Sequence, residues 1–490
     1  MTLETTVSTQ ANNETEAPNL SIGRNLKIGL FHLASGMADV MATGIWNRIM
    51  ISDLGFSATS IGLLVSLRYF LAPLGVWAGR MSDERTVFGF RRLFWVWFGR
   101  ALMVISLLGL GVTTASLAQG VEASALVWIV LTLSLLLFSL GNALSGSTFL
   151  ALVYDRAPER QRGRAVGLVW TFLLLGFSVG GILFGVLLPS NHAPAGALLF
   201  GMGQIALRFG NPTILGFSAA TLQNLFVIAA LLLGGLWFFS LLGEERRGSK
   251  IVREAQPDER GTSLRGDLKL AWGNRQTRVF FWYLALSMLF AFAQDLVLEP
   301  FAGDVFHMSA RITTRFAAYW GSMAILGTLV FLALSRRYKR LTNTVMSVIG
   351  VAVLALTFAL FALSSLVEIR SLVTPGLILL GIGLGAWNIG TLGMMMEMSP
   401  FGRAGTFLGF WTLVVTLARG LGVSGGGIVR DIVLQVTGNL NVSYGAVFAL
   451  EMIGMVAALW LLSQVKVRAF RSAQETPTAD TATILAGSMD

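Results

Sequence analysis

The chain has 490 residues, of which 54% are hydrophobic and only 13% are charged. Soluble domains carry about 25% charged residues, so this composition excludes an ordinary water-soluble protein and predicts an integral membrane protein. No cysteine is present, which excludes disulfides and thiolate metal sites, and with only three histidines no protein-held metal cluster is expected.

Twelve apolar segments follow one another along the chain, and each is long enough to cross a bilayer as a helix. They span roughly 27–51, 58–80, 93–117, 124–154, 163–189, 213–242, 277–301, 313–335, 341–365, 371–398, 403–434 and 442–466. The sequence therefore predicts an all-α membrane protein with twelve transmembrane helices. The polar ends, 1–26 and 467–490, are expected to be disordered tails.

The basic residues predict the orientation of these helices. If the N-terminus is cytoplasmic, 27 of the 36 lysines and arginines fall in the N-terminal tail, the inner loops and the C-terminal tail. Cytoplasmic connections carry such an excess, so both termini are predicted to be cytoplasmic. The same bias accounts for the net charge of +10, and no nucleic-acid partner is expected.

The longest inner connection, 243–276, divides the chain into six-helix halves, 27–242 and 277–466. A faint repeat relates the halves, because Asp155 precedes Pro158 by three residues as Glu397 precedes Pro400. Two pseudo-symmetric six-helix halves resemble the major facilitator superfamily, whose substrate cavity lies between the halves.

The loops at the inner end support this resemblance. The stretch "GRMSDERTVFGFRR" (79–92) is similar to the superfamily's signature between helices 2 and 3, with about three extra residues before its second glycine. The expected residues of the cytoplasmic gating loops are Gly79, Asp83, Gly89, Arg91, Arg92, Asp155, Pro158, Arg162, Gly163, Arg164 and Glu397.

Polar side chains recur on two symmetry-related segments at spacings of three or four, which places them on one helix face. An ionised group in the middle of a membrane helix costs at least about 2.5–3.5 kcal/mol, so it usually faces a cavity or a partner. The expected cavity-lining residues are His32, Asp39, Thr43 and Asn47 on the first segment, Gln294, Asp295 and Glu299 on the seventh, and Asn142 and Asn388 on the fourth and tenth.

The dipeptide Glu299-Pro300 lies near the end of the seventh segment, at the predicted outer edge of the membrane. Proline removes a backbone donor, so Pro300 is expected to end or kink this helix. Glu299 is expected to close the outer mouth of the cavity, either as a functional group or in a structural ion pair. Arg48 and Arg68 are the candidate partners for that pair.

Three stretches carry a closer resemblance: 46–83, 152–170 and "LVLEPFAGDVFHMS" (296–309). Together they resemble the BCH/PUCC family, whose members look like major facilitator proteins and occur in photosynthetic organisms. The resemblance implies a role in assembling light-harvesting complexes, with chlorophyll or bacteriochlorophyll as the cofactor and antenna polypeptides as partners. It implies a photosynthetic or plasma membrane as the location. His32, Asn47, Gln294 and Glu299 are chemically suitable to ligate the pigment's magnesium.

Two other functions remain open from the residues alone. A proton-coupled secondary transporter would use Asp39, Asp295 or Glu299. An enzyme of chlorophyll synthesis is the least favoured, because the sequence offers no nucleophile–base pair, no prenyl-diphosphate motif and no cofactor loop, and a non-enzymatic protein is expected.

Overall fold

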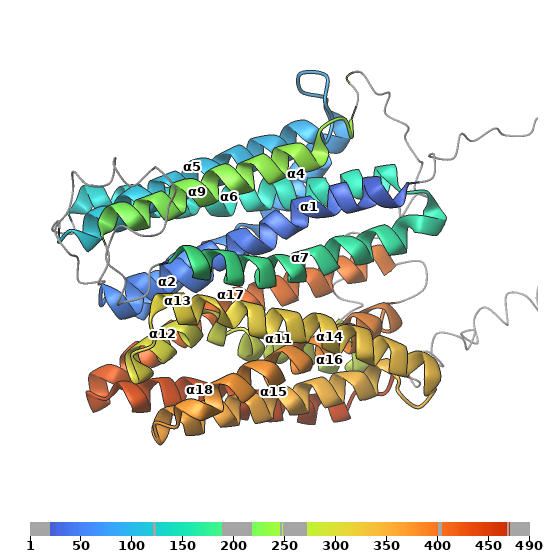
Figure 1. Cartoon of the computed structure of the whole chain (residues 1–490). Helices are drawn as coiled ribbons and strands as arrows, with labels where there is room; N and C mark the ends of the chain where they lie inside the picture. Colours follow the sequence, from blue (N-terminus) through green and yellow to red (C-terminus); the bar gives the residue numbers. More distant parts are fainter. Residues whose placement is uncertain are drawn as a thin grey trace, which may run out of the picture.

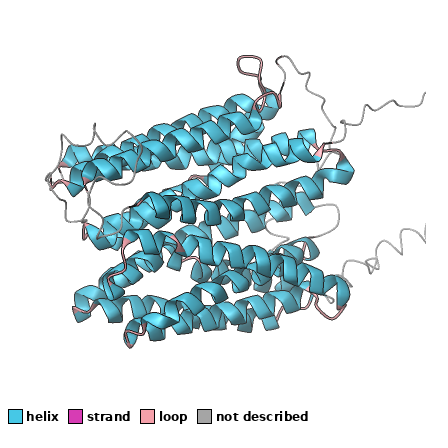
Figure 2. Cartoon of the chain, viewed as in Figure 1, coloured by secondary structure: helices cyan, strands magenta, loops and turns pink. Residues whose placement is uncertain are grey.

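The computed structural model describes residues 20–120, 124–188, 218–245, 247, 272–399, 404–467 and 470. Most of the two predicted disordered tails and most of the predicted linker lie outside these residues, but 20–26 are described, and the chain is helical there from Ile22. Within them, twelve helical spans are long and apolar enough to cross a membrane: Ile22–Asp53, Ala58–Glu84, Leu93–Ala118, Ala125–Arg156, Gly167–Leu187, Ala219–Leu241, Arg275–Phe306, Ala310–Arg337, Asn343–Leu366, Arg370–Glu397, Phe410–Thr437 and Leu440–Ser463. We number them spans 1 to 12. The all-α prediction is confirmed, and the described chain is helix and loop throughout (Figure 2).

Eight spans are built on a single long helix. These are α5 (Leu93–Ala118), α6 (Ala125–Arg156), α7 (Glu159–Leu187), α9 (Ala219–Leu241), α15 (Asn343–Leu366), α16 (Val373–Glu397), which the short helix η3 (Arg370–Leu372) precedes, α17 (Ala404–Thr437) and α18 (Leu440–Ser463). Side-chain oxygens cap several of them at their first turn, as Thr342 and Asn439 do for α15 and α18.

The other four spans are built from shorter pieces. Span 1 contains α1 (Ile22–Asp39), the π-helix η1 (Val40–Ile45), α2 (Trp46–Arg48) and the π-helix η2 (Ile49–Asp53). Span 2 contains α3 (Ala58–Phe70) and α4 (Ala72–Glu84), span 7 contains α11 (Arg275–Ala291) and α12 (Gln294–Phe306), and span 8 contains α13 (Ala310–Thr314) and α14 (Phe316–Arg337).

Spans 1–6 form one bundle and spans 7–12 the other, drawn above and below one another in Figure 1. Helix α7 packs against α1 of its own half and α14 of the other half. By the same pseudo-symmetry, α17 packs against α11 and α12 of its own half and α3 of the other. The boundary between the halves is therefore built from equivalent helices.

Glycines make these contacts close. A Cβ on Gly176 would lie 2.2 Å from the Leu33 carbonyl oxygen of span 1, and one on Gly422 would lie 2.1 Å from the Leu289 carbonyl oxygen of span 7. Small residues at such positions let helix backbones approach each other in lipid.

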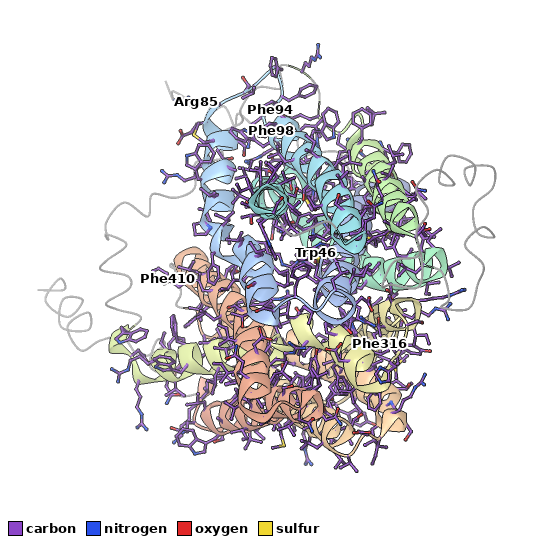
Figure 3. All side chains as sticks on the ribbon, turned by 90° about the vertical axis from the view of Figure 1, so that its left-hand side faces the viewer. Trp46, Arg85, Phe94, Phe98, Phe316 and Phe410 are labelled. Carbon is purple, nitrogen blue, oxygen red and sulfur yellow. The ribbon has the colours of Figure 1, made fainter. Side chains whose placement is uncertain are left out.

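The halves meet mainly at one end of the molecule. The α3 part of span 2 packs on α17, while α4, which leads to the 85–92 loop, packs on α6 of its own half. We call the end with the 85–92 loop the inner end and the opposite end the outer end, following the orientation predicted from charge. Figure 3 looks along the spans from the outer end, with Trp46 in the upper half and Phe316 in the lower half.

Two elements differ from the sequence prediction. Helix α1 begins at Ile22, five residues before the predicted start, with Leu20 buried ahead of it. Span 7 is interrupted at Phe292 and Ala293 and then continues through Pro300 to Phe306. Of the two outcomes expected at Pro300, an end or a kink of the helix, the structure excludes the end, and the reason is a contact with span 1.

Candidate functional site

Two ion pairs lie near the middle of the membrane spans, one in each half. Arg68 of α3 contacts Asp39 of α1, with Nη1 2.7 Å from Oδ1. Arg419 of α17 contacts Asp295 of α12, with Nη2 2.8 Å from Oδ2. Asp39 and Asp295 were predicted to line the cavity, whereas Arg419 was not foreseen and Arg68 was expected to pair with Glu299.

The two pairs meet at Tyr69. The guanidinium carbon of Arg68 lies 4.7 Å from the Tyr69 ring centroid, and that of Arg419, from the other half, lies 5.3 Å from it. The side chains of Asp39 and Arg419 are 30% and 31% exposed. Because a charge in lipid is costly, exposed charges at this depth indicate a polar cavity between the halves.

Spans 1 and 7 both lose regular α-helical geometry beside these ion pairs. The π-helix η1 begins at Val40, and the interruption of span 7 begins at Phe292, 252 residues later. Single-turn π-segments are often functional sites, and interrupted membrane helices present backbone groups to ligands in many transporters. The irregularity thus occupies matching positions in both halves.

Asn47 joins span 1 to span 7. Its Nδ2 donates to the carbonyl oxygens of Leu296 at 3.1 Å and Asp295 at 3.3 Å. Leu296 lies four residues before Pro300, whose missing N–H leaves that carbonyl without its usual helical donor. Asn47 supplies the donor instead, which explains why α12 continues through Pro300.

The prediction that Arg48 or Arg68 pairs with Glu299 is wrong. Arg68 binds Asp39, while Arg48 contacts Asp53 at 2.8 Å and donates to the Met308 carbonyl oxygen at 3.0 Å. Glu299 is buried, and within the described residues it forms no ion pair. The Arg48 guanidinium fills the space beside Gly303, where a Cβ would lie 2.2 Å from its central carbon.

A further contact between the halves closes the outer end. Asp431, on α17, accepts hydrogen bonds from Ser57 Oγ and the Thr59 amide, both at 2.7 Å. The carboxylate thereby caps the first turn of α3, where a negative charge is favourable. Arg430 holds Asp431 at 2.8 Å and reaches Asp304 of span 7 at 3.2 Å.

His32 lies in the core of the first half, away from the boundary with the second. Its ring stacks on Phe149 at 4.8 Å and meets the edge of the half-exposed Trp170 at 6.0 Å. Its Nδ1 is buried without a hydrogen-bond partner in the described chain. Nearby, the Arg100 guanidinium lies between the rings of Phe31 and Trp237, at 4.4 and 4.7 Å.

The remaining predicted cavity residues differ in their surroundings. Thr43 donates its hydroxyl to the Asp39 carbonyl oxygen of its own helix. Asn142 is partly exposed on α6, and Asn388 is exposed on α16 between the buried Trp387 and Thr391. The structure brings neither asparagine into the ion-pair network.

The predicted gating loops form an ion cluster within the first half. Arg92 contacts Asp83 at 2.5 Å and Asp155 at 3.1 Å, and Arg91 reaches both carboxylates at 3.4 Å. Glu245, unforeseen, accepts hydrogen bonds from the Arg91 and Arg92 amides.

The extra residues of the 85–92 loop form a tight turn. Val87 and Phe90 exchange backbone hydrogen bonds of 2.8 and 3.0 Å. Phe88 and Gly89 both have positive φ, as a type I′ turn requires. The insertion therefore leaves the ion pairs of Asp83 intact, and Gly79 lies inside α4.

The second inner signature is described in part. Pro158 is buried and precedes α7, whereas the side chains of Arg162, Gly163 and Arg164 lie outside the described residues. Glu397 accepts a hydrogen bond of 2.9 Å from Asn343 at the start of α15. Helix α15 is equivalent to α5 of the first half, and Asp155 binds Arg92 at the start of α5. The two acids therefore make equivalent contacts.

Sequence reasoning missed several charged residues of the membrane spans, among them Arg100, Asp304, Arg419, Arg430, Asp431 and Glu451. Glu451 is 1% exposed on α18, and both of its oxygens are buried without a hydrogen-bond partner in the described chain. The signal that could have found them is the one applied to spans 1 and 7, a charged residue inside an otherwise apolar run.

Solved structures with this fold are transporters. A bacterial homologue of the human lysosomal transporter Spinster, in an inward-facing and unoccupied conformation, matches 93% of this chain and 98% of its own with a TM-score of 0.65 and 18% identity. The nucleoside transporter NupG matches 91% of this chain and 99% of its own, with a TM-score of 0.60 and 16% identity. The predicted major facilitator-like fold is confirmed.

Sequence relatives include proteins of Rhodovulum and Rhodobacter species. Protein PucC of Rhodovulum sulfidophilum is 29% identical over 86% of this chain and 87% of its own. An uncharacterised protein of Rhodobacter capsulatus, from the puhA-bchM intergenic region, is 30% identical over 84% of this chain and 81% of its own. The bacteriochlorophyll synthase 44.5 kDa chain of that species is 28% identical over 92% of this chain and 97% of its own. The family profile described as PUCC protein matches residues 45–470, so this chain, an integral multi-pass membrane protein, belongs to the PUCC family.

Proposed function

We propose that this protein is an assembly factor for light-harvesting complexes and that it binds chlorophyll or bacteriochlorophyll for transfer to antenna polypeptides. The observation that carries the proposal is membership of the PUCC family over residues 45–470, together with relatives named PucC and bacteriochlorophyll synthase 44.5 kDa chain. It is proposed to act in a photosynthetic membrane without catalysing a reaction, with both termini cytoplasmic.

The described residues fit such a pigment at His32. Asn47 is already engaged, because its Nδ2 donates to span 7 and its Oδ1 accepts from the Arg48 amide, which leaves His32, Gln294 and Glu299 among the four suggested magnesium ligands. The unpartnered Nδ1 of His32 and its aromatic neighbours would suit a flat pigment whose magnesium takes a nitrogen ligand. In this proposal His32 would hold the pigment, and Trp170 would add an aromatic surface beside it.

An absorption spectrum of the protein, purified gently from pigment-containing membranes, tests this proposal. Wild type should carry stoichiometric pigment, and His32→Leu should carry at least tenfold less. His192→Leu is the control, because this histidine lies outside the span that holds His32. Folded wild type without pigment would contradict the proposal. If reconstituted vesicles then accumulate a solute in response to a proton gradient, the transporter alternative holds instead.

A further inference from the structure

Two buried carboxyls beside α12 form no ion pair within the described residues; Arg48 lies within electrostatic range of Glu299, but its guanidinium is already bound to Asp53. In the central network, Arg68 balances Asp39 and Arg419 balances Asp295. Glu299 and Glu451 remain, 6% and 1% exposed, from α12 and α18. Both lie within electrostatic range of Asp295, whose charge would oppose a further negative charge on either of them.

Glu451 is the more isolated of the two. Helix α18 packs against α11, α12, α15 and α17, and no oxygen of Glu451 has a hydrogen-bond partner on the described parts of these helices. The backbone amide of Gln294, at the start of α12, approaches the carboxyl without completing a hydrogen bond. Helices α12 and α17 carry six charged residues: Asp295, Glu299, Asp304, Arg419, Arg430 and Asp431.

Every cation among these residues already has a partner. Arg419 binds Asp295, while Arg430 binds Asp431 and Asp304. Helix α15 has no charged residue, and α11 carries its two arginines, Arg275 and Arg278, in its first turn at the inner end. Tyr444 on α18 itself donates to Asp304. An ionised Glu451 would therefore be an uncompensated charge in the membrane, which is costly.

We propose that Glu451 and Glu299 are two separate proton-binding carboxyls, and that each carries a proton while the halves are closed at the outer end. Protonation makes the central network neutral, because two arginines then face two aspartates. Loss of these protons would place two negative charges beside Asp295, where α12 contacts spans 1, 11 and 12. Proton release would thus favour separation of span 7 from its neighbours. This inference does not depend on pigment binding.

Infrared spectroscopy of the full chain in lipid nanodiscs at neutral pH tests both carboxyls directly. A protonated carboxyl gives a C=O band that is absent from a carboxylate. Wild type should show this band, and Glu451→Gln and Glu299→Gln should each remove a separate component of it. The control is Glu84→Gln, an exposed residue at the inner end of α4, which should leave the band unchanged.

Three results would overturn the proposal. The first is a wild-type spectrum without the band, which would mean that both carboxyls are ionised. If sodium ions then raise the melting temperature, the carboxylates hold a metal cation instead of protons. The second is a band that persists unchanged in both glutamine variants. The third is failure of both Glu451→Gln and Glu451→Met to fold, since a carboxyl that is neutral in the native state tolerates a neutral replacement.

Discussion

Asn47 donates to the Leu296 carbonyl oxygen, which lacks its usual helical donor because Pro300 has no N–H. The sequence alone could not reveal this hydrogen bond. The stripe that contains Asn47 was predicted from spacing alone, and the structure places that residue on the boundary with span 7. Its acceptor could not be predicted, because the free Leu296 carbonyl depends on how two helices dock. Sequence reasoning expected Pro300 to end or kink the helix because it considered only the helix's own hydrogen bonds.

A double-mutant cycle tests this contact. Asn47→Ala should destabilise the protein by about 0.6 kcal/mol, the average for hydrogen bonds between membrane helices, and by no more than about 1.7 kcal/mol. In a Pro300→Ala background the new amide can donate to Leu296, so the same substitution should cost much less. Thermal unfolding in detergent measures all four proteins. Equal costs in both backgrounds would show that Asn47 does not replace the donor missing at Pro300.

The charged residues show the same limit of sequence reasoning. The acids Asp39, Asp295 and Glu299 were identified because each interrupts an apolar run, yet their partners were assigned wrongly or missed. Arg68 and Arg419 lie 29 and 124 residues from the aspartates that they bind. Such pairings follow from tertiary packing, and a single sequence carries no direct signal for them.

At the scale of the elements, the apolar runs predicted the spans well, because length and hydropathy are local properties. The interruption of span 7 was not predicted, since "AFAQ" (291–294) contains neither glycine nor proline. The interruption packs against Gly426 of α17. A Cβ on Gly426 would lie 2.6 Å from the Ala293 carbonyl oxygen, so the close approach depends on glycine there.

Two glycines of α17 provide a prediction with a matched control. A Cβ on Gly422 would lie 2.1 Å from the Leu289 carbonyl oxygen, whereas one on Gly425 would have no atom within 4 Å. Gly422→Ala should therefore destabilise the protein by about 1–3 kcal/mol through overpacking. Gly425→Ala should be neutral or stabilise it by up to about 1 kcal/mol, because alanine favours the helix. Similar melting temperatures for the two variants would contradict this account of the α17–α11 contact.

At the scale of the whole molecule, two pseudo-symmetric bundles meet through equivalent helices at the outer end, where Asp431 and Arg48 link them. The repeat was visible in the sequence as the equal spacings Asp155–Pro158 and Glu397–Pro400, which supported the division into six plus six helices at 243–276. The closed outer end was not predictable, since one sequence can adopt several arrangements of the two halves.

The orientation in the membrane can be tested without background labelling, because the chain has no cysteine. Thr86→Cys lies in the exposed 85–92 turn and Ser371→Cys lies at the opposite end, before α16. The charge bias predicts that an impermeant thiol reagent added to intact cells labels the Ser371→Cys variant and leaves the Thr86→Cys variant unlabelled. The opposite pattern would reverse the orientation, and labelling of both variants would contradict the twelve-span topology.

We propose antenna assembly as the function of this protein, and we propose in addition that this function needs the ion pair between Asp295 and Arg419. The most direct measurement is the antenna absorbance of cells that lack the native gene and carry either wild type or the neutral double variant Asp295→Asn/Arg419→Gln. The double variant avoids the cost of about 3–5 kcal/mol that comes with leaving one buried charge unpaired, so it should accumulate in the membrane. We predict that wild type restores the antenna absorbance and that the double variant, present at an equal level, restores less than about a tenth of it. Normal antenna absorbance in cells without the gene, or full restoration by the double variant, would contradict the account.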